Sequence, residues 1–129
     1  MKYIKKKLTI DRIKIEDIAK KFDTPTYCYS YTQLEKNINN FKKNFKTFSP
    51  LICFAIKSNT NLNLIKEIQK FGLGADVVSM GELMMALKAG MNPKKIVFSG
   101  VGKTSNEISY AIDKKILLIN AESKSEIKE

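Results

Sequence analysis

The chain has 129 residues, 43% of them hydrophobic and 28% charged, which suits one ordinary soluble domain. Its net charge is +10, but Arg12 is the only arginine among 23 basic residues, so a solvated lysine-rich surface explains the charge better than a nucleic-acid footprint. No apolar stretch approaches the roughly 20 residues of a membrane span, and none follows the basic start as a signal peptide requires, so we expect a cytoplasmic protein that binds neither membrane nor nucleic acid.

Cys28 and Cys53 lie 25 positions apart in apolar, strand-like runs, and the chain has no histidine. Neither feature supports a metal site, and two cysteines do not make a disulfide framework. Any chemistry in this chain must therefore rest on Lys, Asp, Glu, Ser, Tyr or Cys.

Four short apolar runs recur along the second part of the chain. Each is nearly continuously hydrophobic and does not alternate with polar residues, as expected of a parallel strand buried on both faces. The runs are LICFAI (51–56), ADVV (75–78), KIVF (95–98) and ILLI (116–119), and polar residues follow them at Lys57, Ser79, Ser99 and Asn120. The polar positions recur at intervals of 22, 20 and 21 residues.

The stretches between the runs predict helices, because their apolar residues stand three and four apart. Helix starts are marked by capping-box patterns, in which a hydroxyl accepts from a free N–H and a longer side chain reaches back to the cap. The patterns are Ser30-x-x-Gln33, Ser79-x-x-Glu82, Thr104-x-x-Glu107 and Ser123-x-x-Glu126. Gly72 and Gly90 stand where C-terminal caps belong, and Pro93 prevents continuation after Gly90.

Strand–helix units at a period near 21 predict an α/β fold with a parallel sheet. A doubly wound sheet and a (β/α)₈ TIM barrel both fit this pattern. The steady short repeat and the absence of a GxGxxG turn favour the barrel. A complete barrel takes about 250 residues, so we expect residues 25–129 to form the first half of one.

Lys57 is the strongest candidate for chemistry. It follows six apolar residues at the carboxyl end of a predicted strand, the face where barrel enzymes place their sites. A partly desolvated amine at that position is a usable Schiff-base nucleophile. The alternative is a lysine that only extends its amine into solvent at a strand end.

The other polar residues near the strand ends are more ambiguous. Asp76 lies inside an apolar strand and needs a partner, which a cationic lysine or imine on the next strand would supply. A capping box explains Ser79 and Glu82 without a catalytic role. The SGVGK loop from Ser99 through Gly100 and Gly102 to Lys103 is too short for a P-loop and suits a tight turn. For Asn120 and Glu122, a turn and cap role is as good an explanation as a ligand role.

Five segments together resemble successive motifs of one enzyme family. They are TPTYCYS, FAIKSNTNLNLIKEI, GLGADVVSMGELMMALKAG, KKIVFSGVGKTSNEISYAI and NAESKSEI. They resemble the diaminopimelate decarboxylase family of fold-type III pyridoxal-phosphate enzymes, which are related to ornithine and arginine decarboxylases and, more distantly, to alanine racemase. The resemblance covers the chain from about Ile13 onward.

The resemblance implies roles for three residues. Lys57 corresponds to the covalent anchor of pyridoxal phosphate, Asp76 to the acidic residue near the cofactor, and Glu82 to the glutamate of the family's SxGE element. The sequence departs from the family at three positions. Asp23 stands in place of a glycine before TP, Ser58 in place of an alanine after the lysine, and Met80 in place of a glycine before GE.

The resemblance also implies parts that lie outside this sequence. The family's phosphate site, ring-stacking histidine and glutamate on the pyridine nitrogen come from later barrel strands, and a C-terminal β-domain follows. By analogy, residues 1–24 would pack beside that β-domain, and the complete protein would be a homodimer.

The expected reaction of the complete protein is decarboxylation of meso-2,6-diaminoheptanedioate to L-lysine, the last step of lysine biosynthesis, and we expect the fragment alone to be inactive. The alternatives are a related decarboxylase of ornithine or arginine type and a non-catalytic fragment that binds pyridoxal phosphate. The substrate in either enzymatic case is a small amino acid.

Overall fold

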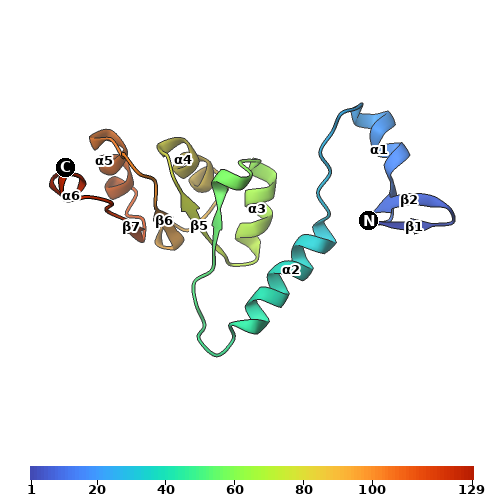
Figure 1. Cartoon of the computed structure of the whole chain (residues 1–129), viewed down its shortest axis with the longest axis horizontal. Coiled ribbons are helices and arrows are strands. Elements are labelled where there is room, and N and C mark those ends of the chain that lie inside the picture. The colour runs from blue at the N-terminus through green and yellow to red at the C-terminus, as the bar shows by residue number, and fades with distance from the viewer. The chain divides into compact units, whose positions relative to one another are not determined.

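The computed structural model describes residues 1–129, and their contacts divide them into two units, Met1–Ser49 and Pro50–Glu129 (Figure 1). Each unit is described by itself. The sequence predicts a boundary after residue 24, because residues 1–24 are expected to pack beside a further domain. That boundary stays a prediction. No helix in the chain has the length and apolar character needed to cross a membrane.

The first unit contains a small antiparallel sheet and two helices. The sheet runs β1-β2-β3, and its elements are β1 (Lys2–Ile4), β2 (Lys7–Ile10), β3 (Ile13–Lys14), α1 (Ile15–Phe22) and α2 (Tyr31–Asn44). Lys5 and Lys6 form the β1–β2 turn with φ of 49° and 64°, the left-handed geometry of the tightest hairpins. Thr9 is buried, and its hydroxyl donates to the carbonyl oxygen of Lys2 at 2.9 Å.

Asp11 ties the small sheet to the start of α2. Its carboxylate accepts from the hydroxyl of Ser30 at 2.6 Å and from the N–H of Thr32 at 3.3 Å. Asp23 has φ of 65° at the end of α1, in the left-handed region that favours glycine. The strand-like reading of the run around Cys28 is wrong, because residues 26–30 pair with no other strand.

The second unit contains the four-stranded parallel sheet that the apolar runs predict. Its strands are β4 (Cys53–Ala55), β5 (Gly74–Val77), β6 (Ile96–Phe98) and β7 (Leu118–Ile119), in the order β4-β5-β6-β7. Every neighbouring pair is parallel, and Ala55 is the register partner of Asp76, which in turn pairs with Val97. The predicted parallel α/β architecture is therefore confirmed.

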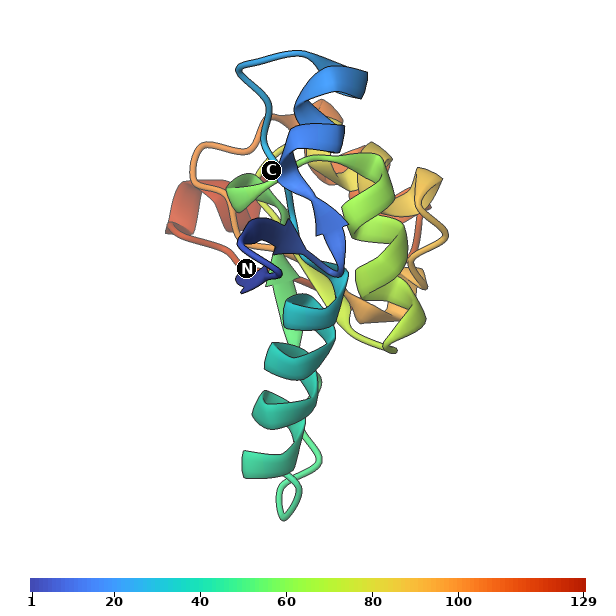
Figure 2. The same ribbon diagram turned by 90° about the vertical axis from the view of Figure 1, so that its right-hand side faces the viewer.

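Helices follow each strand of this sheet. They are α3 (Leu62–Lys70), α4 (Met80–Lys88), α5 (Ser105–Asp113) and α6 (Lys124–Lys128), with short 3₁₀ turns η1 (Ile56–Ser58) and η2 (Pro93–Lys95). Figures 1 and 2 show α3, α4 and α5 one after another along one side of the sheet. Side chains of alternate strand residues are fully buried beneath them, including those of Ala75, Val77, Ile96 and Phe98.

Within residues 50–129, no helix layer covers the opposite face of the sheet. Ala55, Asp76 and Val97 share this face because register partners in a parallel pair point the same way, and each is only partly buried. Helices outside and an open face inside are the arrangement of a barrel wall. Polar groups on the open face thus have room for a ligand or for further chain.

The four predicted hydroxyl caps are present, but three of the four predicted capping boxes are wrong in their second half. The hydroxyls of Ser30, Ser79, Thr104 and Ser123 each accept the N–H three residues on. Only Thr104 and Glu107 form a complete, reciprocal capping box. Gly72 and Gly90 end α3 and α4 with φ of 76° and 87°, as expected of C-terminal caps.

Candidate active site

Four polar residues gather at the carboxyl edge of the parallel sheet. Lys57 lies in η1, which directly follows β4, and Ser79 comes two residues after β5. Ser99 and Asn120 directly follow β6 and β7. Because the strands are parallel, these side chains lie along one edge, and the predicted placement of all four is confirmed.

Lys57 carries a free amine at this edge. The residue is exposed, and its amine makes no hydrogen bond or ion pair within the chain. Directly before it, Ile56 is fully buried and anchors the turn, while the hydroxyl of Ser58 donates to the carbonyl oxygen of Ala55 at 2.8 Å. Residues 50–129 leave Lys57 exposed, and its partial desolvation, which was expected of the complete barrel, stays a prediction.

Asp76 provides an unsatisfied carboxylate on the inner face of the neighbouring strand. Its Oδ1 atom is buried and has no hydrogen-bond partner. Such an atom is costly unless a cation or donor meets it. The prediction that this carboxylate needs a partner from outside its own strand thus agrees with the structure.

Cys53 lies close enough to Asp76 for the carboxylate charge to affect the pKa of its thiol. Burial, and secondarily the negative charge of Asp76, raise the pKa of the Cys53 thiol. The thiol also faces the carbonyl oxygen of Lys95, at a sulfur–oxygen distance of 3.9 Å. Cys53 is therefore a neutral, partly buried thiol under ordinary conditions and no ready nucleophile.

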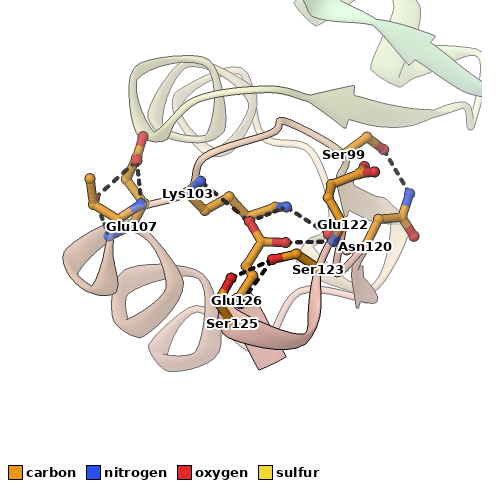
Figure 3. Close-up of polar contacts among 9 residues, drawn as sticks. Ser99, Lys103, Glu107, Asn120, Glu122, Ser123, Ser125 and Glu126 are labelled. Carbon is orange, nitrogen blue, oxygen red and sulfur yellow. Dashed lines mark hydrogen bonds and ion pairs between the residues drawn. The ribbon is translucent and has the colours of Figure 1, made fainter. Parts of the chain in front are cut away.

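Lys103, the nearest rival to Lys57, is locked in place. The glycine-containing sequence of the SGVGK loop predicts a flexible segment in which the Lys103 ammonium stays hydrated, and this prediction is wrong. Only 1% of the side chain is exposed; its Nζ donates to Glu126 Oε1 at 3.1 Å and to the carbonyl oxygen of Asn120 at 2.6 Å (Figure 3). An amine whose hydrogen bonds are taken up by a carboxylate and a carbonyl oxygen in a buried position is not accessible to an aldehyde.

Ser99 and Asn120 form a polar pair across the ends of β6 and β7. The side-chain amide of Asn120 donates to the hydroxyl oxygen of Ser99 at 3.0 Å. The glycines of the SGVGK loop serve the backbone: a side chain on Gly100 would overlap the carbonyl oxygen of Val78, and Gly102 has φ of 65°. The loop is thus a close-packed turn that carries Ser99 at its start.

The carboxylates near the helix starts have structural partners. Glu82 accepts from the N–H of Val78 at 2.9 Å, and Glu107 accepts from the N–H of Met80 at 3.0 Å. The pKa of the Glu107 carboxyl is lowered, mainly by the hydrogen bond from Met80 and next by one from the backbone N–H of Thr104. Glu122 contributes its backbone N–H to Glu126 at 2.6 Å. Glu82 thus bonds the N–H of Val78 and not that of the cap residue Ser79, so the predicted reciprocal capping box is wrong here, although the contact is still a structural one at the start of α4.

Reasoning from the sequence missed the Lys103–Glu126 ion pair. The Ser123-x-x-Glu126 pattern accounted for Glu126 as a cap alone, and no periodic signal marks Lys103 as buried. The nearness of Cys53 to Asp76 could have been found, because alternate residues on paired strands share a face. No cluster of three or more His, Cys, Asp or Glu side chains suited to a metal ion occurs in residues 1–129.

The arrangement supplies one accessible amine, one unsatisfied carboxylate and a neutral polar pair along a single edge. An accessible lysine amine can bond covalently to an aldehyde, and a nearby carboxylate stabilises positive charge on the nitrogen. Asp76 Oδ1 has no hydrogen-bond partner and lies beside an open face, so a cationic group formed from a carbonyl compound and an amine could bind there and satisfy it.

Comparison with known proteins points to the same chemistry. A sequence profile described as "Pyridoxal-dependent decarboxylase, pyridoxal binding domain" matches residues 31–129. Diaminopimelate decarboxylase of Aquifex aeolicus is 40% identical over 127 residues, which cover 98% of this chain and 30% of that protein. Its counterpart from Helicobacter pylori strain J99 is 44% identical over 113 residues, 88% of this chain and 28% of that protein.

A solved structure extends the likeness to three dimensions. Diaminopimelate decarboxylase from M. jannaschii in co-complex with L-lysine is 37% identical, with a TM-score of 0.91 over 95% of this chain and 30% of that one. The chain thus spans about 30% of the length of the relatives it matches. The parallel sheet and its helices correspond to the barrel-like part of such structures, which confirms the predicted fold class.

Proposed function

Because this chain belongs to the pyridoxal binding domain family of pyridoxal-dependent decarboxylases, we propose that the complete protein converts meso-2,6-diaminoheptanedioate to L-lysine with pyridoxal phosphate as cofactor. The bond between one α-carbon and its carboxylate breaks, carbon dioxide leaves, and a proton takes its place on that carbon. Pyridoxal phosphate, when bound, supplies the electron sink that makes this bond cleavage possible.

The observation that carries the proposal is the free amine of Lys57 at the carboxyl edge, one strand away from the unsatisfied Asp76. A cofactor aldehyde requires an amine that is accessible and unpaired. Lys57 meets this requirement, whereas Lys103 is held by Glu126. Lys57 is therefore the anchor in this proposal.

Asp76 has a supporting electrostatic role in the proposal. Its buried oxygen supplies negative charge on the inner face, and positive charge on the Lys57 nitrogen or on the bound cofactor would satisfy it. Neighbouring strands are separated by roughly 5 Å, so two residues on adjacent strands are close enough to interact through such a group.

The rest of the proposed enzyme completes the surroundings of Lys57. Cover over the open inner face would exclude water from the amine. The homodimer and the cytoplasmic location expected from the sequence belong to this proposal. Sedimentation of the complete protein and fractionation of cells that express it test these two points.

The proposal is tested with the purified complete protein and added pyridoxal phosphate. We expect L-lysine and carbon dioxide from meso-2,6-diaminoheptanedioate, and much slower release of carbon dioxide from ornithine or arginine. Lys57→Ala should abolish lysine formation and the visible absorbance of the lysine-bound cofactor. Lys66→Ala, a change of an exposed lysine on α3, is the matched control and should leave both unchanged.

Faster turnover of ornithine or arginine would support the alternative decarboxylases. Cofactor binding without release of carbon dioxide from any of the three amino acids would indicate a non-catalytic protein. Either result would refute the proposed activity.

A further inference from the structure

Lys103 is the one charged residue in the chain that is buried. Its ammonium group contacts Glu126 Oε1 at 3.1 Å and the carbonyl oxygen of Asn120 at 2.6 Å, and it lies 5.6 Å from the centre of the Phe98 ring. Glu126 also accepts the backbone N–H groups of Lys103 and Glu122. The ion pair therefore joins the SGVGK loop to the start of α6.

These contacts fix the backbone of Asn120 from both sides. Its N–H donates to the carbonyl oxygen of Phe98 at 2.9 Å, and its carbonyl oxygen accepts from Lys103. The side chain of Asn120 projects from this fixed backbone to Ser99, as Figure 3 shows. Lys103 thus acts on Asn120 and, through it, on the hydroxyl of Ser99.

The Ser99–Asn120 pair has hydrogen-bonding capacity that the chain does not use. The hydroxyl proton of Ser99, the second amide proton of Asn120 and the amide oxygen of Asn120 have no partner in the structure. Both residues stand at the carboxyl edge of the sheet, where Lys57 also lies. An oriented donor–acceptor pair at this edge is suited to bind a polar group of a ligand.

We propose that Lys103 is a positioning residue that holds the Ser99–Asn120 pair in the orientation that binds a polar group of the amino-acid substrate. This inference rests on the proposed function and adds a substrate-binding role for residues two and three strands away from Lys57. The buried charge holds the pair in place and makes no contact with substrate itself.

The test compares variants of the complete protein. Lys103→Met/Glu126→Gln removes both charges together, so neither is left buried without a partner. We expect hydrogen exchange of residues 96–103 and 116–122 to accelerate while that of β4 and β5 stays unchanged. The KM for meso-2,6-diaminoheptanedioate should rise about tenfold, the loss of roughly one hydrogen bond, with kcat changed less than twofold.

Asn120→Ala supplies an independent arm, because Asn120 is exposed and its removal leaves the ion pair intact. It should raise KM to a similar extent, and combining it with the double variant should give no further rise. Lys114→Met is the control: Lys114 is an exposed lysine whose Nζ lies 5.1 Å from the centre of the Tyr110 ring, and it has no ion pair.

Three results would overturn the inference: an unchanged KM in Asn120→Ala, an unchanged KM in the double variant despite faster exchange, or additive effects of the two changes. If the double variant fails to fold, the KM of Asn120→Ala alone decides. Failure of the wild-type protein to decarboxylate the substrate would instead refute the proposed function, so the two failures are distinguishable.

Discussion

Glu107 accepts a hydrogen bond from the backbone N–H of Met80 at 3.0 Å, although 27 residues separate them. The same carboxylate closes the capping box with Thr104 at the start of α5. One side chain thus satisfies free N–H groups at the starts of two consecutive helices. The Glu126 carboxylate similarly accepts the N–H of Glu122, just before α6, and the N–H of Lys103 in the loop before α5. Glu107 and Glu126 therefore each fasten a strand–helix unit to the preceding one, whereas Glu82 accepts a hydrogen bond only within its own unit.

Removal of the Glu107 charge should make the free energy of unfolding less dependent on pH in the acidic range. Its pKa in the folded chain lies below the ordinary value of 4.5, so its stabilisation is present above that value and is lost as pH falls through the folded pKa. Glu107→Gln should unfold at a lower urea concentration at pH 7 and lose less stability on going to pH 3. Glu67→Gln, at an exposed pair with Lys70, is the control. An equal acid-induced loss in wild type and Glu107→Gln would contradict this assignment.

The core beneath the helices should be sensitive to truncation at Phe98. This side chain is fully buried and also faces Lys103, so Phe98→Ala should cost about 3–5 kcal/mol in free energy of unfolding. Phe48 is 80% exposed, and Phe48→Ala should change that free energy by no more than about 0.5 kcal/mol. Urea unfolding of the complete protein measures both. Similar losses in the two variants would mean that the core is not where the structure has it.

Substitution of alanine at two glycines, Gly74 and Gly81, should change stability in opposite directions. A methyl group on Gly74 would overlap the carbonyl oxygen of Lys95 and come within 2.9 Å of Cys53 Sγ, so Gly74→Ala should destabilise by about 1–3 kcal/mol. The nearest atom to a methyl group on Gly81 is Ser79 Oγ at 3.8 Å, and Gly81 is in α4. Gly81→Ala should therefore raise Tm slightly. A tolerated Gly74→Ala would show that β5 and β6 are not this close at their amino ends.

The chain of residues 1–129 by itself should associate. The sheet has unpaired edges at β4 and β7, its inner face is open, and Leu117 and Leu118 are about half exposed. We expect sedimentation to show oligomers or aggregates and thermal melting to be broad. A monomer with a sharp two-state transition would contradict this expectation.

The parallel sheet was predictable because its strands are apolar on both faces and recur at a steady interval. The helix starts were equally accessible, since a hydroxyl followed three residues later by an acid has a specific local meaning. The β1–β2 hairpin was not: its turn consists of Lys5 and Lys6 in left-handed conformations, without the glycine or asparagine that usually signals such a turn.

The site was predictable only in part. The position of Lys57 followed from the end of an apolar run, but its exposure depends on what covers the inner face, which a local pattern does not contain. The glycine-containing loop around Lys103 predicts a hydrated side chain. Lys103 is instead buried because it contacts Glu126, which lies 23 residues away in the sequence. Such long-range pairing of opposite charges leaves no signature in a single sequence.

The assignment of Lys57 as the anchor of pyridoxal phosphate is tested most directly by borohydride reduction of the complete protein with the cofactor, followed by peptide mapping. The free amine of Lys57 and the ion-paired amine of Lys103 lead us to expect a pyridoxyl label on the peptide that contains LICFAIKSN. A label on the FSGVGKT peptide, or one scattered over surface lysines, would contradict the account.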